Sequence, residues 1–581
     1  MAKNASKLKR RNLMKKFILP TILSFVFLSA GIISAQWISD SLLNTPVCVY
    51  SGNQQEAAIC KDQVGGVYVF WRDYRDETGM FGGDIYGQRL DANGIIKWTE
   101  NGTVIQTTSY GEFAPQAVPD KNGGVILLWS QNPNGFYDYK LFCQRLDSTG
   151  NKLWGADGKT IAESNGTNSF PQITSDGRGG AYIVWMNLPA TPGSTDIYLQ
   201  HVDSTGSLYW PANGLAICDT SNSQSYPALC ADGLGGVFIV WQDSRNISNP
   251  DIYAQYIDGD KNVLWPHNGL AICQASGSVE FPDIVGDGQG GVFIVWQDNR
   301  NIDNGIALQH VNAAGELLLD EQGVMICNAE NTKSDVNIIS DGNDGAYIIW
   351  QDERSGDCDI YAQYINQDAV PQWSANGIPI IAAANDQLTP AAIVDELGNC
   401  FMAWSDDRGD EWGDIYGQMI NTSGNLLWDS EGIGMATANG YEQEEPVVEI
   451  ISDGNFVLSW LDMRNETDFD IYVHKTNRDE HLVSAINYDY YPVCESYRLE
   501  QNYPNPFNPV TIIEIAIPES GFYTLKVYNI QGEKVAELIN HKLNAGIYRF
   551  CFDASGLSSG TYFYTLKGNH ISISKKMILL R

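Results

Sequence analysis

Short apolar runs and turn-forming clusters alternate along most of this chain with a period of about 55 residues. In one repeat, residues 227–230 form a first run, residues 237–241 a second and residues 251–257 a third. Residues 263–265 and 270–272 together form a fourth run. Runs of this length, rich in Val, Ile, Tyr and Trp and separated by Gly and Asp, are typical of β-strands. The pattern therefore predicts four strands in each repeat and an all-β fold.

A tryptophan ends the second run of every repeat. Successive copies lie 58, 56, 56, 55, 54, 54 and 56 residues apart. Such regular self-similarity is the signature of a repeat architecture, and four antiparallel strands per unit are typical of a β-propeller blade. We therefore predict an eight-bladed β-propeller over residues 36–480; seven blades would require one accessory unit, which the even spacing disfavours. The anchoring tryptophans are Trp71, Trp129, Trp185, Trp241, Trp296, Trp350, Trp404 and Trp460.

The phase of the repeats predicts how the ring closes. The last repeat lacks the fourth run, and residues 37–48 begin with that element. The N-terminal strand would complete the eighth blade and remove two exposed sheet edges. Seven further tryptophans stand at the fourth-strand position, where we expect core packing and not sugar binding: Trp37, Trp98, Trp154, Trp210, Trp265, Trp373 and Trp428.

In six repeats an aspartate and an arginine follow the anchoring tryptophan. Six copies of one pair cannot all be catalytic, so we expect a structural role, with the arginine bridging to a carboxylate or to turn carbonyls of the adjacent blade. The repeat signature consists of Trp71, Asp73, Arg75, Trp241, Asp243, Arg245, Trp296, Asp298, Arg300, Trp350, Asp352, Arg354, Trp404, Asp406, Arg408, Trp460, Asp462 and Arg464.

Three units depart from the repeat. The second and third repeats, residues 129–133 and 185–189, lose both charged residues, and the fifth has Gly305–Ala307 in its third run and Leu319 in place of tryptophan. Because repeat proteins place function where the consensus is broken, we expect a ligand surface near the second and third units.

The N-terminus and the net charge indicate export and limit the partners. Residues 1–35 combine seven basic residues, an apolar run and a small-residue site before Gln36, which predicts a cleaved signal peptide. The formal charge is −34, and the seven basic groups leave −41 on the remainder. A surface this acidic repels phosphate backbones, so we expect no nucleic acid partner. We expect a monomer.

The 11 cysteines do not resemble a disulfide framework. Cys48, Cys218, Cys273 and Cys327 occupy one repeat position, after apolar residues, and Cys60 and Cys230 share another. Recurrence at apolar positions is typical of small buried side chains. Since no Cys-x-x-Cys or Cys/His cluster occurs, we expect no metal and no cofactor.

A second unit follows a linker at residues 481–498. Residues 511–517, 523–528, 534–538, 547–552, 561–566 and 571–580 predict six strands with turns every 8–12 residues, which suggests a small β-sandwich.

The motifs of this unit resemble a known family. The opening Tyr-Pro-Asn-Pro-Phe-Asn-Pro, the Ser-Gly-Thr-Tyr segment and the closing Lys-Lys-Met are similar to the type A C-terminal sorting domain of proteins exported by the type IX secretion system. This resemblance covers residues 499–581 and implies an Ig-like sandwich, Sec export, outer-membrane translocation by the secretion machinery, and removal or surface anchoring. Hook-capping Ig-like domains are the alternative. The matching residues are Tyr503, Pro504, Asn505, Pro506, Phe507, Asn508, Pro509, Gly560, Tyr562, Lys575, Lys576 and Met577.

The sequence singles out no catalytic residue. It contains no His-Glu-x-x-His and no phosphate-binding loop, and its seven histidines are scattered. We therefore expect a non-catalytic module, secreted or on the outer surface of a Gram-negative cell, that binds an extracellular glycan or protein. The alternative is a polysaccharide hydrolase or lyase with its site at the central mouth of the propeller.

Overall fold

The computed structural model describes residues 37–580 apart from residues 39, 76–81, 134–137, 164–165, 190–192, 247–248, 275, 301–303, 410–411, 439–441, 479–496, 500, 503–504, 508–509, 519–520, 544–545, 555–556 and 569–570. The predicted signal peptide and most of the predicted linker lie outside the described residues. So do Tyr503, Pro504, Asn508 and Pro509. The described residues form 39 strands and no helix, and hence no helix suited to crossing a membrane.

The first four sheets follow the sequence without interruption. Sheet one contains β2 (Gln54–Lys61), β3 (Val67–Asp73), β4 (Asp84–Leu90) and β5 (Thr103–Gln106). Sheet two contains β6 (Gly111–Pro119), β7 (Val125–Asn132), β8 (Lys140–Leu146) and β9 (Lys159–Ala162). Sheet three contains β10 (Gly166–Ser175), β11 (Ala181–Pro189), β12 (Asp196–Val202) and β13 (Leu215–Cys218). Sheet four contains β14 (Gln224–Ala231), β15 (Val237–Asp243), β16 (Asp251–Ile257) and β17 (Leu270–Cys273).

The next four sheets repeat this order, and the last takes one strand from the N-terminus. Sheet five contains β18 (Ser278–Gly286), β19 (Val292–Asn299), β20 (Gly305–Val311) and β21 (Val324–Cys327). Sheet six contains β22 (Lys333–Ser340), β23 (Ala346–Asp352), β24 (Asp359–Ile365) and β25 (Ile378–Ile381). Sheet seven contains β26 (Gln387–Val394), β27 (Cys400–Asp406), β28 (Asp414–Ile420) and β29 (Ile433–Ala436). Sheet eight contains β30 (Gln443–Ile450), β31 (Phe456–Asp462), β32 (Asp470–Thr476) and β1 (Thr45–Cys48).

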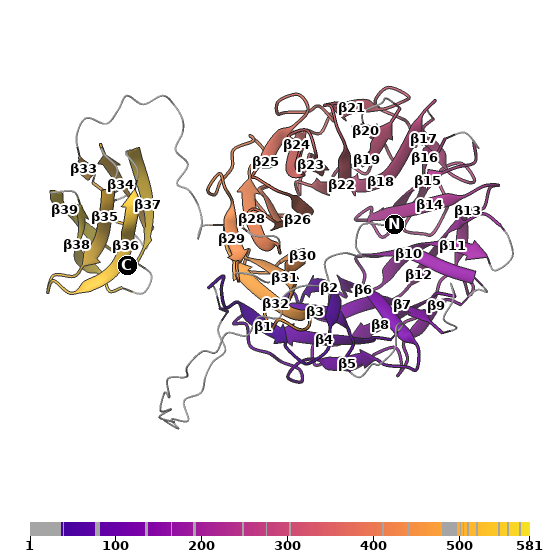
Figure 1. Cartoon of the computed structure of the whole chain (residues 1–581), viewed down its shortest axis with the longest axis horizontal. Coiled ribbons are helices and arrows are strands. Elements are labelled where there is room, and N and C mark those ends of the chain that lie inside the picture. Colours follow the sequence, from indigo (N-terminus) through magenta and orange to yellow (C-terminus); the bar gives the residue numbers. More distant parts are fainter. Residues whose placement is uncertain are drawn as a thin grey trace, which may run out of the picture. The chain divides into compact units, whose positions relative to one another are not determined.

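The eight sheets form a closed series. The first strand of each sheet contacts the first strand of the next, and β2 contacts β30. Figure 1 shows these first strands innermost, around a common centre. β1 pairs antiparallel with β32, with Thr45 opposite Val473, which is the pairing that the repeat phase predicts. Sheet eight therefore gains its fourth strand from the start of the chain.

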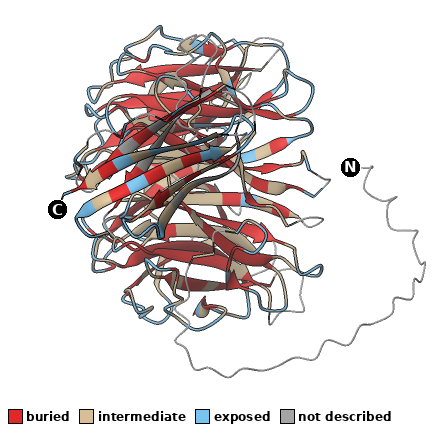
Figure 2. Ribbon diagram, turned by 90° about the vertical axis from the view of Figure 1, so that its left-hand side faces the viewer, coloured by how far each residue is buried: buried red, intermediate tan, exposed pale blue. Residues whose placement is uncertain are grey.

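The core lies between neighbouring sheets. All eight anchoring tryptophans are buried. Trp241, for example, packs with Ile239 of its own sheet and with Tyr182 and Val184 of sheet three. Figure 2 shows burial concentrated along the strands and exposure in the connecting turns. Each aromatic side chain thus joins two sheets.

The fourth strand is shorter than the sequence predicts, because it does not include the second set of tryptophans. In sheet four, β17 begins at Leu270, and Val263 makes only an isolated bridge to Ile257. Trp265 precedes the strand, and its backbone N–H donates to Gln255 Oε1 at 3.0 Å. Because this buried side chain satisfies the backbone group, the segment needs no strand partner.

The C-terminal unit consists of two antiparallel sheets. One contains β33 (Arg498–Leu499), β34 (Val510–Ile517) and β37 (Gly546–Asp553). The other contains β36 (Lys534–Leu543), β35 (Gly521–Tyr528), β38 (Gly560–Gly568) and β39 (Ile571–Leu579). A single apolar cluster joins them and includes Phe507, Ile515, Tyr564 and Met577.

Candidate functional site

The repeat signature forms one hydrogen-bonded unit in each of six sheets. The tryptophan Nε1 donates to the aspartate Oδ2 at 2.7–3.3 Å. The arginine Nε donates to the same carboxylate through Oδ1 at 2.8–2.9 Å. In five of the sheets the guanidinium lies 3.6–4.2 Å from the ring centroid of a third-strand tyrosine. The carboxylates are buried, and these hydrogen bonds hold each of them against its tryptophan and its arginine.

The arginine also binds a turn carbonyl, but within its own sheet. Arg245 Nη2 donates to the carbonyl oxygen of Asn268 at 2.7 Å, and Asn268 precedes β17 of the same sheet. The expected bridge to the adjacent sheet is therefore wrong for this contact. Burial raises the pKa of Asp243, but hydrogen bonds from Arg245 and Trp241 outweigh burial and hold that pKa below its usual value.

Sheets two and five, which depart from the repeat in different ways, show what its common residues supply. In sheet two Gln131 replaces the aspartate, and the buried Trp129 Nε1 has no hydrogen-bond partner among the described residues. In sheet five Ala307 replaces the tyrosine, and Arg300 Nη1 donates to Gln322 Oε1 at 3.0 Å. Leu319 keeps the backbone contact of the missing tryptophan, because its N–H donates to Gln309 Oε1 at 3.1 Å.

All eight first strands contain a β-bulge that the sequence analysis did not predict. Each first strand has a β-bulge opposite the end of the second strand. One residue of every bulge has φ between 48° and 56°, a left-handed conformation that favours glycine, yet none is glycine. We call these residues the bulge ring: Glu56, Ala114, Phe170, Tyr226, Phe281, Asp335, Thr389 and Glu445.

Three neighbouring members of the bulge ring are aromatic. The ring centroids of Phe170 and Tyr226 are 5.1 Å apart, and those of Tyr226 and Phe281 are 4.7 Å apart. Phe170 is 50% exposed and Phe281 is 40% exposed. These three residues, from sheets three, four and five, form what we call the aromatic wall.

Acidic members of the bulge ring come from sheets eight, one and six. Glu56 accepts a hydrogen bond from the Ala114 N–H at 2.5 Å and forms an ion pair with Arg72 at 3.1 Å. Burial, with the negative charge of Glu56, raises the pKa of Glu445. Asp335 accepts a hydrogen bond from Gln351. The contact with Ala114 and the influence on Glu445 show that Glu56 lies close to the members of the ring on both sides of it.

Beside this ring, Glu444 is a further perturbed carboxyl group. Burial, together with the charges of Glu442 and Glu445, raises the pKa of Glu444 to about 7. Like charges at short range disfavour ionisation, and burial adds to that effect. A carboxyl group that holds its proton near neutral pH can act as an acid or as a hydrogen-bond donor.

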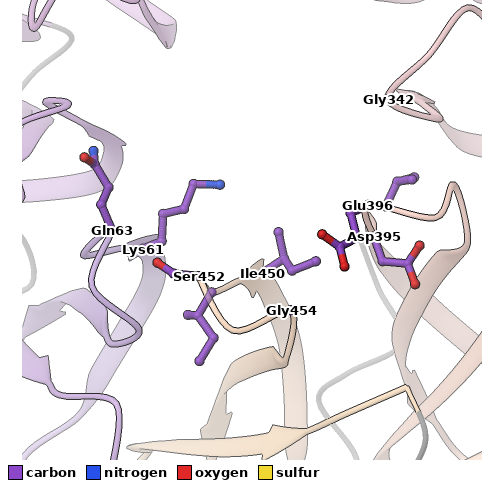
Figure 3. A pocket seen from close by; sticks show the side chains of 10 residues that line it. Lys61, Gln63, Gly342, Asp395, Glu396, Ile450, Ser452 and Gly454 are labelled. Atoms are coloured by element: carbon purple, nitrogen blue, oxygen red, sulfur yellow. The ribbon is translucent and has the colours of Figure 1, made fainter.

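The opposite ends of the first strands surround a cavity of about 530 Å³. Figure 3 shows Lys61 and Gln63 on one side, Asp395 and Glu396 on the other, and Ile450 between them. Lys61 forms an ion pair with Glu449 at 3.4 Å, and Asp395 forms one with Arg478 at 3.3 Å. Two of the charged groups at this end, Lys61 and Asp395, are therefore held in ion pairs.

The described residues were compared with what a metal site or a reactive thiol requires. No group of three or more His, Cys, Asp or Glu side chains in that part of the chain is placed to hold a metal ion. Nine cysteines are described, all free and all but Cys230 buried. Burial raises the pKa of Cys48 to about 12, so this thiol is a poor nucleophile.

In the C-terminal unit, the opening motif around Phe507 lies beside the closing strand that contains Met577. The Phe507 N–H donates to the Ile578 carbonyl at 3.0 Å, and Asn505 Oδ1 accepts from the Ile578 N–H at 2.9 Å. Residues 501–580 match the family model of the secretion system C-terminal sorting domain. This unit is a sorting domain. A chain with such a domain is exported to the cell surface or beyond it. Within the sorting domain Phe507 and Met577 are buried, whereas Lys576 is exposed.

Comparison with solved structures gives only distant likenesses. The polysaccharide lyase Uly1 is 11% identical with a TM-score of 0.39, covering 68% of this chain and 94% of its own. A family PL25 ulvan lyase is 10% identical with a TM-score of 0.39, and the match covers 75% of this chain and 96% of the lyase. An endo-arabinase from Bacteroides thetaiotaomicron is 14% identical with a TM-score of 0.25, covering 41% and 89%. These values are too low to transfer an activity. No curated protein matches the chain.

Proposed function

We propose that this exported chain is an eight-bladed β-propeller that acts as a non-catalytic binding module, followed by an Ig-like sorting domain. The domains are a signal peptide at 1–35, the propeller at 36–480, a linker at 481–498 and the sorting domain at 499–581. Sec export delivers the chain to the periplasm of a Gram-negative cell. The secretion machinery then recognises the sorting domain and moves the protein, a monomer, across the outer membrane.

The bulge ring carries the binding proposal. A left-handed backbone costs a non-glycine residue about 1–2 kcal/mol, and the same cost recurs in all eight sheets. The backbone at these positions is constant, while the side chains range from Ala114 to Tyr226. Strained residues with variable side chains at one end of a rigid scaffold are typical of a ligand site.

Depletion of the purified protein from solution tests this function. The matrices are insoluble polysaccharides, washed cell envelopes and immobilised extracellular proteins, and each supernatant is also assayed for new sugar ends. We expect depletion without product. Product formation would contradict the non-catalytic role, and the absence of depletion by every matrix would contradict binding.

Glu444 favours one second candidate, a polysaccharide hydrolase or lyase with its site at the same mouth. Its raised pKa suits a general acid, which such enzymes require. In that case Glu444→Gln would abolish sugar-end formation. The matched variant Glu163→Gln changes an exposed carboxylate paired with Lys140 and would leave product formation unchanged.

A further inference from the structure

We propose that the bulge ring takes a polysaccharide without acidic groups, whose sugar rings stack on the aromatic wall. This inference rests on the binding role proposed above and names the ligand class for that site. It is carried by two independent observations, the exposed aromatic side chains and the charge that surrounds them.

The aromatic wall is not part of the core between sheets. The clusters that join sheets three to four and four to five are formed by other side chains, such as Trp241 and Trp296. Phe170 and Phe281 instead leave 50% and 40% of their surface in solvent. Ala114 holds the same bulge position in sheet two, so the backbone does not require an aromatic side chain there. Two exposed rings, with the half-buried ring of Tyr226 between them, are therefore explained by a ligand that covers them.

The geometry of the wall suits sugar rings. Planes of neighbouring rings meet at 59° and 61°, so the three rings are inclined to one another and do not form a flat stack. A pyranose ring has C–H groups on its faces and hydroxyl groups around its edge. Its faces pack on aromatic rings, while its hydroxyls need hydrogen-bond partners at the rim.

The rest of the bulge ring supplies those partners and sets the charge preference. In the closed series of eight sheets, sheet eight with Glu445 lies four positions from sheet four with Tyr226. Sheet seven contributes Thr389, which is exposed, and sheet six contributes Asp335, also exposed. Carboxylate and hydroxyl oxygens accept hydrogen bonds from sugar hydroxyls, or pair with protonated amino groups. The same carboxylates, on a chain of net charge −34, repel uronic acid and sulfated polymers.

The test is retention of the purified full chain on immobilised polysaccharides of three classes. Neutral polymers are represented by β-glucan, xylan, mannan and chitin, amino polymers by chitosan, and acidic polymers by polygalacturonate and a sulfated galactan. Immobilised polylysine represents basic peptides. We expect retention on at least one neutral or amino polymer and none on the acidic polymers.

Variants identify the surface that binds. Phe170→Ala, Tyr226→Ala and Phe281→Ala together should weaken retention at least tenfold, and Ala114 shows that alanine is accommodated at this backbone position. Tyr209→Ala is the matched control, since Tyr209 is a 57% exposed aromatic residue in the connection between β12 and β13. Unchanged thermal unfolding of each variant establishes that it is folded; a wall variant that unfolds is replaced by the single variant Phe170→Ala.

Each outcome decides between the two proposals. Retention on an acidic polymer, or full retention of the wall variants, overturns the sugar-stacking inference while the binding role stands. Retention on polylysine alone also overturns it and indicates a basic peptide ligand. If no immobilised polymer retains the protein and neither cell envelopes nor immobilised proteins deplete it from solution, the binding role itself is overturned.

Discussion

The indole Nε1 of Trp37 donates a hydrogen bond of 2.9 Å to the carbonyl oxygen of Ala92, 55 residues along the chain. The same contact links five other sheets to the next one in the series, as from Trp98 to Ser148 at 3.2 Å. Trp37 thus makes for sheet eight the contact that five of its counterparts make for their own sheets. The equivalent pairs are Trp154 with Ser204, Trp265 with Ala313, Trp373 with Thr422 and Trp428 with Arg478.

A protein that begins at residue 49 should be less stable than one that begins at residue 36, and it should oligomerise. The deletion leaves the edge of β32 unpaired and removes Val47 and Cys48 from the cluster between sheets eight and one. Differential scanning calorimetry and light scattering measure the two effects. Trp37→Phe is the control, because it keeps the strand and loses one hydrogen bond of about 1 kcal/mol. A truncated protein that stays monomeric and keeps the same midpoint of thermal unfolding would exclude closure of the ring by the pairing of β1 with β32.

Asp243→Asn should lower the free energy of unfolding by about 3 kcal/mol, since it leaves the guanidinium of Arg245 partly buried beside a neutral group. Urea unfolding measures the change. Lys97→Gln breaks an exposed ion pair with Asp91 at 3.5 Å and should cost less than about 1 kcal/mol. Equal effects of the two substitutions would show that the signature contributes no more than a surface pair.

Ala114→Gly should raise the free energy of unfolding by about 0.5–1 kcal/mol, because glycine accepts the left-handed φ of 51°. Ala117→Gly provides the comparison in the same strand, beyond the bulge, where glycine should lower stability by about as much. Chemical denaturation of both variants gives the sign of each change. A loss of stability in both would mean that the bulge is not strained.

The raised pKa values of Glu444 and Asp470 should make stability fall as pH rises. Burial and neighbouring negative charges raise the pKa of Glu444 from 4.5 to about 7, and burial with the charge of Asp462 raises that of Asp470 from 3.8 to about 7. The folded state therefore keeps protons that the unfolded state has released, so stability is lost from about pH 4.5 to 7.

Glu444→Gln should reduce this loss between pH 5 and 7, measured by urea unfolding at several pH values. Glu163→Gln alters an exposed carboxylate and should follow the unchanged protein. Parallel curves for Glu444→Gln and the unchanged protein would contradict the assignment of the raised pKa to this residue.

The nine described cysteines should resist alkylation in the folded protein. Burial raises the pKa of Cys358 to about 12 and that of Cys273 to about 11, so few thiolates are present at pH 8. Mass spectrometry after iodoacetamide treatment, with and without urea, counts the modified thiols. Modification of Cys48 or Cys218 without urea would contradict their burial.

The sequence predicted the features that recur with constant residues. Trp71 and its seven counterparts anchored the four-strand unit, and the displaced phase of Trp37 predicted the pairing of β1 with β32. These predictions succeeded because periodic apolar positions reflect burial between sheets. The length of the fourth strand was wrong, because the side-chain contacts of Gln255 with the segment around Trp265 are tertiary and leave no period in the sequence.

The bulge ring could not be predicted from the sequence, because its residues do not recur. Its backbone recurs in every repeat, but its side chains do not, and Glu56, Phe170 and Thr389 share no chemical property that a pattern could reveal. A left-handed residue is predicted from glycine or asparagine, neither of which occurs at these positions. The ligand surface expected near the second and third units overlaps the aromatic wall only at sheet three.

The constancy of the bulge has a consequence for how specificity can change. Each of the eight sheets has one left-handed residue in its bulge, and this residue is distinct from the anchoring tryptophan and its carboxylate partner. The side chain at one bulge can therefore change without changing the anchoring unit of its sheet, although neighbours such as Phe170 and Tyr226 are in contact. Under the proposed binding role, single substitutions at these positions would each alter one sector of the ligand surface.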